Sequence, residues 1–582
     1  MPEASDDTAR LLAEKLKIER LVAAILATRG FTDAAAASDF LYPKLNELHD
    51  PFLMRGMAEA VPRVRTAIAR REPMLLYGDY DADGTCSIIV LKKTIELLGG
   101  LADFYIPHRL KDGYGMRSEV ISQAAASGVR LVISVDTGIR AAEVVRHANG
   151  LGIDVIVTDH HLPEEELPPA FAVLNPNQPG CLYPNKHLCG AGVTFKLVQA
   201  LLESGEMPET RRTALLDSFL KPVAIATVAD IVPLSGENRV IVKRGLSGLR
   251  NIRNFGLKAL LTVAGFDDGE IPSAHQVAFR LAPRINAAGR MATANSVIEL
   301  FLTEDAGRAR QLAEQLDQLN SERQKTESDI VESVLQSCEE IPVPADRAAL
   351  VFRGENWHLG VLGIVASRLV ERFCRPVFVL SNAAIMGDDD QLLLAGSGRS
   401  LPAFHLLEAL ESMPDLFRKF GGHRQAAGLT LSAANFDEFC QRLHTFAAGR
   451  LSLSDFRPQF QIDAIATLAE LTERAAAQVL SLGPFGFGNP NPVLCCLRVR
   501  VAGTPRPFSS GKHFTIPLEQ NGRTLFCKAW NLAERVAAFV PDALFDVLLQ
   551  IEDDPVSRKR GYGSWCITLK DFRSSSPDLT IS

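Results

Sequence analysis

The sequence lacks the features of a membrane protein or of an exported one. No apolar run reaches the roughly 18 residues that a bilayer-spanning helix needs. Residues 1–7 are acidic and contain no apolar signal core. The 10 cysteines follow no regular spacing, which is typical of reduced thiols in a cytosol. We therefore expect a cytoplasmic protein without a membrane segment.

An excess of positive charge is also absent, because the formal net charge is −7. This excludes a protein coated with basic residues, but it does not exclude one that binds nucleic acid. Attraction to phosphate is local and is screened over roughly 10 Å, so a narrow basic channel can coexist with an acidic exterior. The 47% hydrophobic and 23% charged residues indicate an ordinary globular protein.

Strand and helix signals change along the 582 residues, which suffice for three to five domains of roughly 100–200 residues each. Over 61–302 these signals alternate, which predicts an α/β fold with a mostly parallel sheet covered on both faces. Residues 303–343 predict one long helix that connects this unit to a smaller α/β unit. The remaining segments predict short helices over 1–60, the smaller α/β unit over 344–450, a small β-barrel over 451–573 and a disordered tail over 574–582.

Three carboxylates follow the first predicted strand of the α/β unit. Asp79, Asp81 and Asp83 come directly after the apolar run 74–77, at the strand end where open α/β sheets bind ligands. In an extended segment these alternate side chains share one face, and their charges repel unless a cation lies between them. A divalent metal is the simplest solution, and a solvated Asp-Gly turn is the alternative. A calcium-binding helix–loop–helix does not fit, because Val90 stands where its glutamate would be.

Two further predicted strands end in possible metal ligands. Asp136 follows the apolar run 131–135, and Asp159, His160 and His161 follow the next run. A mixed set of carboxylates and imidazoles suits Mn²⁺ or Mg²⁺ better than structural zinc. Asp230 lies in another apolar stretch, where burying it is costly unless it caps a helix or faces a charge. We interpret it as a fourth source of ligands.

Two glycine-rich segments in the smaller α/β unit carry basic residues. Ser397 and Arg399 lie in 395–400, and His423 and Arg424 lie in 421–428. Small residues let backbone amides approach a phosphate, and arginine adds a bidentate donor pair. These segments predict phosphate-binding loops, with ordinary glycine loops as the alternative.

Aromatic residues in the predicted barrel permit two interpretations. Phe514, Phe526 and Trp530 alternate with Lys512 and Lys528 in strand-like segments. Exposed rings beside lysines suit base stacking in a single-strand-binding barrel. The same rings could instead fill the barrel core. We predict Phe514 and Trp530 as stacking residues and keep the core alternative open.

The motifs at Asp79–Gly84, Asp136–Gly138, Asp159–His161 and Ala229–Asp230 resemble the four motifs of the DHH phosphoesterase superfamily. The segments 107–109, 113–115 and 280–290 resemble, within it, the RecJ family of bacterial single-strand exonucleases. The resemblance covers nearly the whole chain, without a departure at the motif positions. It implies that the first α/β unit is a DHH domain, the second a DHHA1 domain and the barrel an OB-fold.

The resemblance also implies roles for individual residues. Two ions, Mn²⁺ or Mg²⁺, would be held by Asp79, Asp81, Asp83, Asp136, His160 and Asp230, with Asp136 and Asp230 as bridging or shared ligands. The catalytic residues would be Asp81, Asp83, Asp136, His160, His161 and Asp230, with His161 on the scissile phosphate. The strand would be bound by Arg109, His161, Arg280, Arg284, Asn286, Arg290, Ser397, Arg399, His423 and Arg424.

By the same resemblance, the expected activity is metal-dependent degradation of single-stranded DNA from 5′ to 3′ with release of mononucleotides. The expected setting is recombinational and mismatch repair, as a monomer accompanied by a single-strand-binding protein and a helicase. No residue reveals the direction. One alternative is a small-nucleotide or cyclic-dinucleotide phosphodiesterase, which needs no C-terminal barrel. The other is a non-catalytic single-strand-binding scaffold, which the complete carboxylate set disfavours.

Overall fold

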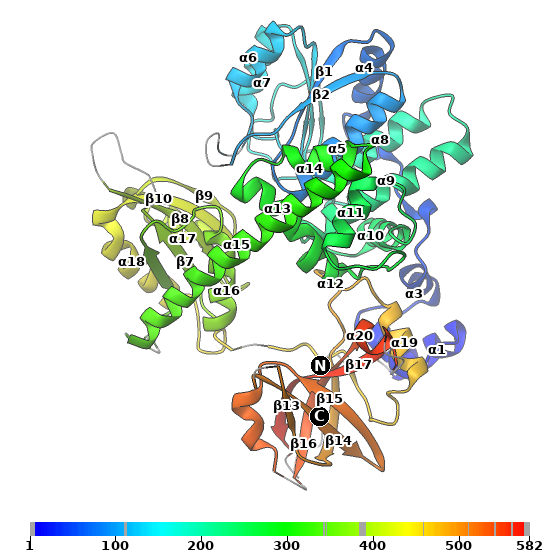
Figure 1. Cartoon of the computed structure of the whole chain (residues 1–582), viewed down its shortest axis with the longest axis vertical. Coiled ribbons are helices and arrows are strands. Elements are labelled where there is room, and N and C mark those ends of the chain that lie inside the picture. The colour runs from blue at the N-terminus through cyan, green and yellow to red at the C-terminus, as the bar shows by residue number, and fades with distance from the viewer. Residues whose placement is uncertain are drawn as a thin grey trace.

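The computed structural model describes residues 6–109, 113, 115–340, 344, 346–382, 392–457, 459–509, 511–540, 543–559 and 563–575. Figure 1 shows a large first lobe at the top, a second lobe at the left and a barrel lobe at the bottom. The long helix α15 runs from the first lobe to the second. Among the described helices, none combines the length and the apolarity needed to cross a membrane.

A five-stranded sheet in the order β2-β1-β3-β4-β5 forms the centre of the first lobe, and all its strands are parallel. Alternate strand residues belong to opposite cores, because Leu76 packs with α4, α5 and α8 whereas Leu75 packs with α6 and α7. The predicted parallel sheet with two covered faces is therefore confirmed. The elements are β1 (Pro73–Tyr77), β2 (Leu101–Tyr105), β3 (Leu131–Val135), β4 (Asp154–Thr158), β5 (Ala172–Leu174), α4 (Met57–Ala69), α5 (Ala82–Leu97), α6 (Ser118–Ala126), α7 (Ala142–Gly150) and α8 (Gly190–Glu203).

Further helices complete the first lobe around α9 (Glu209–Ala229), which ends immediately before Asp230. Helix α10 packs along α9, and Gly245 lies so close that a Cβ there would be 2.2 Å from the carbonyl oxygen of Leu220. The position of α9, and thus of Asp230, depends on this contact. The other elements are α10 (Gly236–Gly248), α11 (Phe255–Val263), α12 (Ala274–Gln276), the π-helical turn η3 (Val277–Leu281), α13 (Ala282–Met291), α14 (Asn295–Leu302) and the short turns η1 (Leu45–Glu47) and η2 (Pro51–Leu53).

Helix α15 (Ala306–Glu340) contributes to the cores of two lobes. Its residues Leu312 and Leu316 belong to the core of the first lobe, whereas Ile330 and Val334 pack against the second lobe. The second lobe is a mixed sheet in the order β6-β7-β8-β10-β9, in which only β6 and β7 are parallel. Its elements are β6 (Leu350–Gly354), β7 (Val377–Ser381), β8 (Leu393–Arg399), β9 (Phe417–Gly422), β10 (Ala426–Ser432), α16 (Leu362–Phe373), α17 (Leu406–Glu411), α18 (Phe436–Ala448), η4 (Pro414–Leu416) and η5 (Ala433–Asn435).

The two glycine-rich segments are mainly strands, so their prediction as loops is wrong. The first lies in β8, and the second spans the hairpin of β9 and β10. Their glycines serve close packing in the sheet. A Cβ at Gly396 would lie 2.0 Å from the carbonyl oxygen of Val379, and one at Gly398 would lie 2.4 Å from the ring of Phe378.

The barrel lobe confirms the predicted small barrel. Strands β12, β16, β17, β15 and β14 follow one another in the sheet, and pairing of β14 with β12 closes the circle. Strand β17 was not predicted; it reaches into the predicted tail, whose residues 576–582 lie outside the described part of the chain. The elements are β11 (Ala464–Ile465), β12 (Leu494–Val501), β13 (Arg506–Phe508), β14 (His513–Gln520), β15 (Arg523–Ala529), β16 (Leu544–Asp553), β17 (Trp565–Ser574), α19 (Glu473–Ser481), α20 (Pro555–Lys559) and η6 (Ala533–Ala538).

The N-terminal helices pack on the barrel lobe, although they are furthest from it in sequence. Helices α1 (Asp6–Leu16), α2 (Arg20–Thr28) and α3 (Ala34–Leu41) share one apolar core with the barrel. The buried Arg239 of α10 connects this core to the first lobe, because it donates to the carbonyl oxygens of Phe40 and Gly483. The N-terminal helices and the barrel lobe thus both contact the first lobe through Arg239.

We predict that Gly245→Ala lowers the free energy of unfolding by about 1–3 kcal/mol, the range for overpacking at a rigid contact. The clash with the Leu220 carbonyl outweighs the gain of about 1 kcal/mol that alanine otherwise brings to a helix. Urea unfolding measures the change. Gly248→Ala is the matched control in the same helix, because its nearest neighbour is the flexible Lys221 side chain. Equal stability of the two variants would contradict the assignment.

Candidate metal centre

The carboxylate loop between β1 and α5 is more tightly folded than the sequence suggests. Asp81 caps α5, and its carboxylate accepts hydrogen bonds from the amides of Asp83 and Gly84 at 2.9 and 3.0 Å. The prediction that Asp79, Asp81 and Asp83 share one face of an extended segment is therefore wrong, because Asp83 already lies in the helix. Gly84 permits this turn, since a Cβ there would be 2.5 Å from the carbonyl oxygen of Asp79.

The N-terminus of α8 holds Asp83. The amides of Gly190 and Ala191 donate to its two carboxylate oxygens at 2.6 and 2.7 Å, where the helix dipole favours negative charge. Position 190 has to be glycine, because a Cβ would lie 2.5 Å from Oδ1 of Asp136. Sequence reasoning missed Gly190, since a glycine at the start of an apolar helix carries no signal that distinguishes it from the nearby Gly192.

Asp136 occupies a strained position at the end of β3. Its backbone φ of 58° lies in the left-handed region, which costs energy for a residue other than glycine. The residue is 2% exposed, and its Oδ1 is buried without a hydrogen-bond partner among the described residues. A buried carboxylate oxygen without a donor is the feature expected of a cation ligand.

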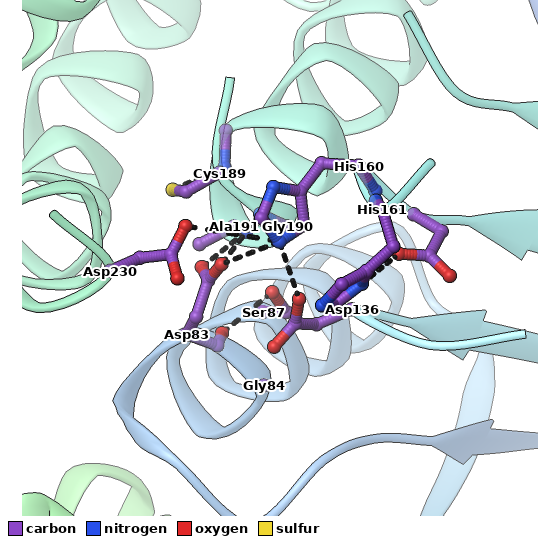
Figure 2. A network of polar contacts seen from close by, with 12 residues as sticks. Asp83, Gly84, Ser87, Asp136, His160, His161, Cys189, Gly190, Ala191 and Asp230 are labelled. Atoms are coloured by element: carbon purple, nitrogen blue, oxygen red, sulfur yellow. Dashed lines mark hydrogen bonds and ion pairs between the residues drawn. The ribbon is translucent and has the colours of Figure 1, made fainter. Parts of the chain in front are cut away.

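His160 lies at the centre of the carboxylates, as Figure 2 shows. Its Nε2 is 3.3 Å from Oδ1 of Asp136 and 3.8 Å from one oxygen each of Asp83 and Asp230. Asp230 reaches this point from the C-terminal end of α9. The side chains come from four separate segments of the chain and converge beyond the carboxyl ends of β3 and β4.

Asp159 positions the two histidines. It is buried, and its Oδ1 accepts hydrogen bonds from the amides of His160 and His161 and from Nδ1 of His161 at 2.7 Å, while Oδ2 accepts from the amide of Ile139. Burial opposes the charge of His161, but the bond to Asp159 and its charge raise the histidine pKa overall. Burial likewise opposes the charge of Asp159, yet its bond to His161 lowers the carboxyl pKa. Asp159 is thus a positioning residue rather than a ligand.

Among the described residues, three overlapping groups of side chains could each hold a cation. Asp136 belongs to two groups and His160 to two, whereas Asp230 belongs to one. This geometry supports Asp136 as a ligand shared by two cations. It places Asp230 in a single group, as a ligand of one cation. The groups are Asp79, Asp81 and Asp136; Asp83, His160 and Asp230; and Asp136, His160 and His161.

Electrostatics also fit a divalent cation. Burial and the charge of Asp81 raise the pKa of Asp79 well above its usual value. Burial and the charge of Asp83 do the same to the pKa values of Asp136 and Asp230. A cation among these oxygens would offset both the burial of the carboxylates and their mutual repulsion, because it favours the charged form of each carboxylate. The oxygen-rich set with one or two imidazoles suits Mn²⁺ or Mg²⁺.

Helix α13 supports the carboxylate loop from behind. Oδ1 of Asn286 accepts a hydrogen bond from the amide of Ala82 at 2.7 Å. Gly289 lies against the loop, since a Cβ there would be 2.3 Å from the carbonyl oxygen of Tyr80. Arg290 extends across to the second lobe and donates to the carbonyl oxygen of Gly360. Asn286, predicted to bind substrate, is placed here to shape the metal loop.

The predicted strand-binding arginines fall into two classes. Arg280 donates to the carbonyl oxygen of Ala264, and Arg284 forms an ion pair with Asp317. These contacts engage both arginines within the first lobe and its connecting helix.

The other basic residues cluster between the first two lobes. Burial and the charge of Arg109 lower the pKa of Arg290 to about 10 and also lower that of Arg399. Burial and the charge of Arg399 lower the pKa of His423. Ser397 lies two residues before Arg399 in β8, whereas Arg424 donates to the carbonyl oxygen of Pro402. Mutual repulsion among such cations is relieved by a bound anion.

The barrel aromatics separate into core and surface. Phe514 is 2% exposed and belongs to the barrel core, so its prediction as a stacking residue is wrong. Trp530 is 44% exposed and contacts the rings of Phe508 and His513. A one-residue shift of strand register decides which ring faces inward, and the sequence alone does not specify it.

Family models match all three lobes. The DHH family N-terminal domain matches residues 73–227, the DHHA1 domain matches 346–449 and the RecJ OB domain matches 462–561. The single-stranded-DNA-specific exonuclease RecJ of Dickeya dadantii is 40% identical over 461 residues, which cover 77% of this chain and 79% of that protein. The chain belongs to the RecJ family. The RecJ of Bacillus subtilis is 39% identical over 542 residues, 93% of this chain and 67% of that protein.

The fold of the RecJ family agrees with this assignment. The crystal structure of RecJ from Thermus thermophilus in complex with Mn²⁺ matches with a TM-score of 0.82 and 28% identity. The match covers 98% of this chain and 78% of that one. The predicted order of DHH, DHHA1 and OB-fold lobes is therefore confirmed.

We predict that Mn²⁺ stabilises the protein more at about pH 8 than at about pH 6. Because the pKa values of Asp79, Asp136 and Asp230 are raised, the metal-free fold binds more protons than the unfolded chain. Its stability therefore falls as the pH rises from the usual carboxyl pKa of 3.8 through the raised values. The cation binds the deprotonated carboxylates, so the stability that it adds is largest at the higher pH. Thermal unfolding with and without Mn²⁺ measures the gain.

Asp136→Asn should lose most of this gain at both pH values, whereas Asp217→Asn, at an exposed ion pair with Arg244, should keep it. A gain that does not depend on pH in the unmodified protein would contradict the electrostatic assignment.

Proposed function

We propose that the protein is a metal-dependent exonuclease that degrades single-stranded DNA. The observation that carries this proposal is the overlap of three ligand groups on Asp136 and His160 in a chain of the RecJ family. Such an overlap provides places for two neighbouring cations, as phosphodiester hydrolysis at a two-metal site requires.

The chain's residues would divide the work as follows. Asp79, Asp81 and Asp136 would hold one Mn²⁺ or Mg²⁺ ion, and Asp83, His160 and Asp230 would hold the other. The ions would supply Lewis acidity for activating water and for neutralising charge on the scissile phosphate. His161, whose pKa is raised against its burial by the contact with Asp159, would be a cation at the rim and orient that phosphate.

The basic cluster between the lobes would bind the end of the strand. Arg109, Arg290 and Arg399 lack a carboxylate ion pair among the described contacts. Arg109 lies over the ring of Tyr80 in the carboxylate loop, Arg290 is near Asp81, and Arg399 is near the other two arginines. We infer that this cluster and His423 hold the 5′ phosphate, which sets a 5′ to 3′ direction and the release of mononucleotides. The single helix α15 keeps the lobes close, which favours a single strand over a duplex.

From the motif resemblance we infer a role in recombinational and mismatch repair in the cytoplasm. We infer that the protein acts as a monomer beside a single-strand-binding protein and a helicase. The barrel supports a long substrate, because a phosphodiesterase for dinucleotides would gain nothing from it. Comparing turnover of a long single strand with that of a dinucleotide distinguishes these activities.

Asp136→Ala should reduce release of nucleotides from single-stranded DNA by at least about a thousandfold, because the shared ligand is lost. Binding of the strand without metal should change little, since the basic cluster is untouched. Acid-soluble nucleotide release and fluorescence anisotropy measure the two effects. Asp217→Ala is the surface control. Persistent cleavage by the Asp136 variant would refute the assignment of the site.

Arg399→Ala should weaken the preference for a 5′-phosphorylated over a 5′-hydroxyl strand by about ten- to a hundredfold, the range for a charge-assisted hydrogen bond. Arg399→Lys should restore only part of it, because lysine lacks the bidentate donor pair. Competition between the two labelled strands gives the ratio. Arg372→Ala, exposed in the same lobe, is the control, and an unchanged ratio in Arg399→Ala would remove that residue from end recognition.

A further inference from the structure

A large cavity lies where the N-terminal helices, the barrel lobe and the first lobe meet. Its volume is about 780 Å³, within the roughly 300–1,000 Å³ that is usual for small-molecule sites. It is lined by residues within 29–49, the start of α10, the segments 459–463 and 488–493, and Gln550. None of the described residues that line it belongs to the three ligand groups of the metal centre. We call it the junction cavity.

Arg239 brings a buried cation with a spare donor to the junction cavity. The residue is 2% exposed, and its Nε and Nη2 donate to the carbonyl oxygens of Phe40 and Gly483. Its Nη1 is buried without a hydrogen-bond partner among the described residues. Burial and the charge of Arg29 lower the pKa of Arg239 to about 9. A buried guanidinium with a free donor is suited to an anion, which would balance its charge.

Four carboxylates also line the junction cavity, and two of them are already paired. Glu237 pairs with the buried Lys196 at 3.0 Å, and Asp463 pairs with Arg29 at 2.8 Å. The remaining two are Asp39 and Glu47. Since the charge of neither raises the pKa of Arg239, they leave its guanidinium unbalanced.

The N-terminus of α10 faces the same cavity. Ser235, Gly236 and Glu237 line it, and the Ser235 side chain caps no amide of the helix. The first amides of a helix have no partner within the helix, and its dipole favours an anion at this end. Arg239 lies one turn further along the same helix. The helix amides and the guanidinium therefore offer donors to the same anionic group.

Other segments add an unpartnered acceptor and aromatic rings. Nδ2 of Asn491 donates to the carbonyl oxygen of Ile551, which fixes the orientation of the amide. Its Oδ1 is buried, and no donor in the described part of the chain bonds to it. Phe460 lines the cavity and is 39% exposed, and the rings of Phe31 and Phe40 line it at 4.8 Å between their centres. A matching ligand therefore carries an anion and a flat ring with an N–H donor.

A nucleotide combines these groups, because its phosphate is an anion and its base has a flat face and N–H donors on its edge. We propose that the junction cavity binds a nucleoside monophosphate, with the phosphate at the N-terminus of α10 and Nη1 of Arg239 and the base at Phe460 and Asn491. This site is separate from the metal centre, and binding there does not require the proposed nuclease activity. The bound nucleotide contacts the barrel lobe and the first lobe together, so it should also raise the thermal unfolding temperature.

The test measures binding of deoxyadenosine monophosphate (dAMP) to the full chain by isothermal titration calorimetry. EDTA and the Arg399→Ala background keep the nucleotide from the metal centre and its basic cluster. We expect a single site, at which inorganic phosphate and deoxyadenosine each bind at least about tenfold more weakly than dAMP. A 5′-phosphorylated oligonucleotide should leave dAMP bound. Its displacement by the oligonucleotide, or an absence of dAMP binding, would overturn a site for the free nucleotide.

Ser235→Asp separates ligand binding from folding. An aspartate here would cap α10 and suit its dipole, so the thermal unfolding temperature without ligand should be equal or higher. Its charge would repel the phosphate, so the affinity for dAMP should fall by about tenfold or more. Thr472→Asp is the matched control, because it adds the same charge at the N-terminus of α19, outside the cavity. This variant should bind dAMP as the parent protein does.

Phe460→Ala tests the place of the base. It should weaken binding of dAMP by about tenfold, the size expected for one lost stack, and leave the weaker binding of inorganic phosphate unchanged. Phe171→Ala, an exposed phenylalanine outside the cavity, should change neither affinity. Unchanged affinity for dAMP in Ser235→Asp or in Phe460→Ala, or equal affinities for dAMP and inorganic phosphate in the parent protein, would overturn the proposed site. Nuclease activity is measured apart from these titrations, so its failure would overturn the proposed function alone.

Discussion

The structure of the first lobe depends on how it offsets the repulsion among the carboxylates around His160. Asp83 and Asp136 are each 2% exposed, and burial raises the pKa of both. Two amides at the N-terminus of α8 stabilise Asp83, whereas Asp136 keeps a buried oxygen that no donor in the described part of the chain reaches within hydrogen-bond geometry. The fold thus stabilises one buried carboxylate with its own amides, whereas the other carboxylate would be stabilised by a cation.

The same centre depends on contacts that cross the lobes. Asn286 and Gly289 of α13 shape the carboxylate loop, and Arg290 of the same helix donates to the second lobe. Arg323 and Glu327 of α15 pair with each other, and Glu327 also pairs with Arg368 of α16. A change in the distance between lobes would therefore act on the metal ligands through two packed helices, which move as rigid bodies more readily than they deform.

Much of the site could be predicted because strand ends in a parallel sheet converge. The apolar runs before Asp79, Asp136 and Asp159 predicted three such ends, and the structure brings these segments together. The role of Gly190 could not be predicted, because it arises from a close approach to Asp136, which is distant in sequence. The role of Asp159 could not be predicted either, because the motif does not say whether its carboxylate faces a cation or bonds to the neighbouring His161. Phe514 was misassigned for a related reason, since alternation within a strand does not say which face is inward.

Two strained residues border the centre, and their positions have a common cause. Asp136 and Ile231 are both left-handed, and each lies at the end of a buried element, β3 or α9. A chain that leaves such an element must turn sharply to present a side chain beside the sheet edge. The buried element supplies enough packing to hold the unfavourable conformation, which a mobile loop could not. The side chain that follows each turn is thereby fixed before substrate arrives, and the strain is carried by the folded state rather than by the reaction.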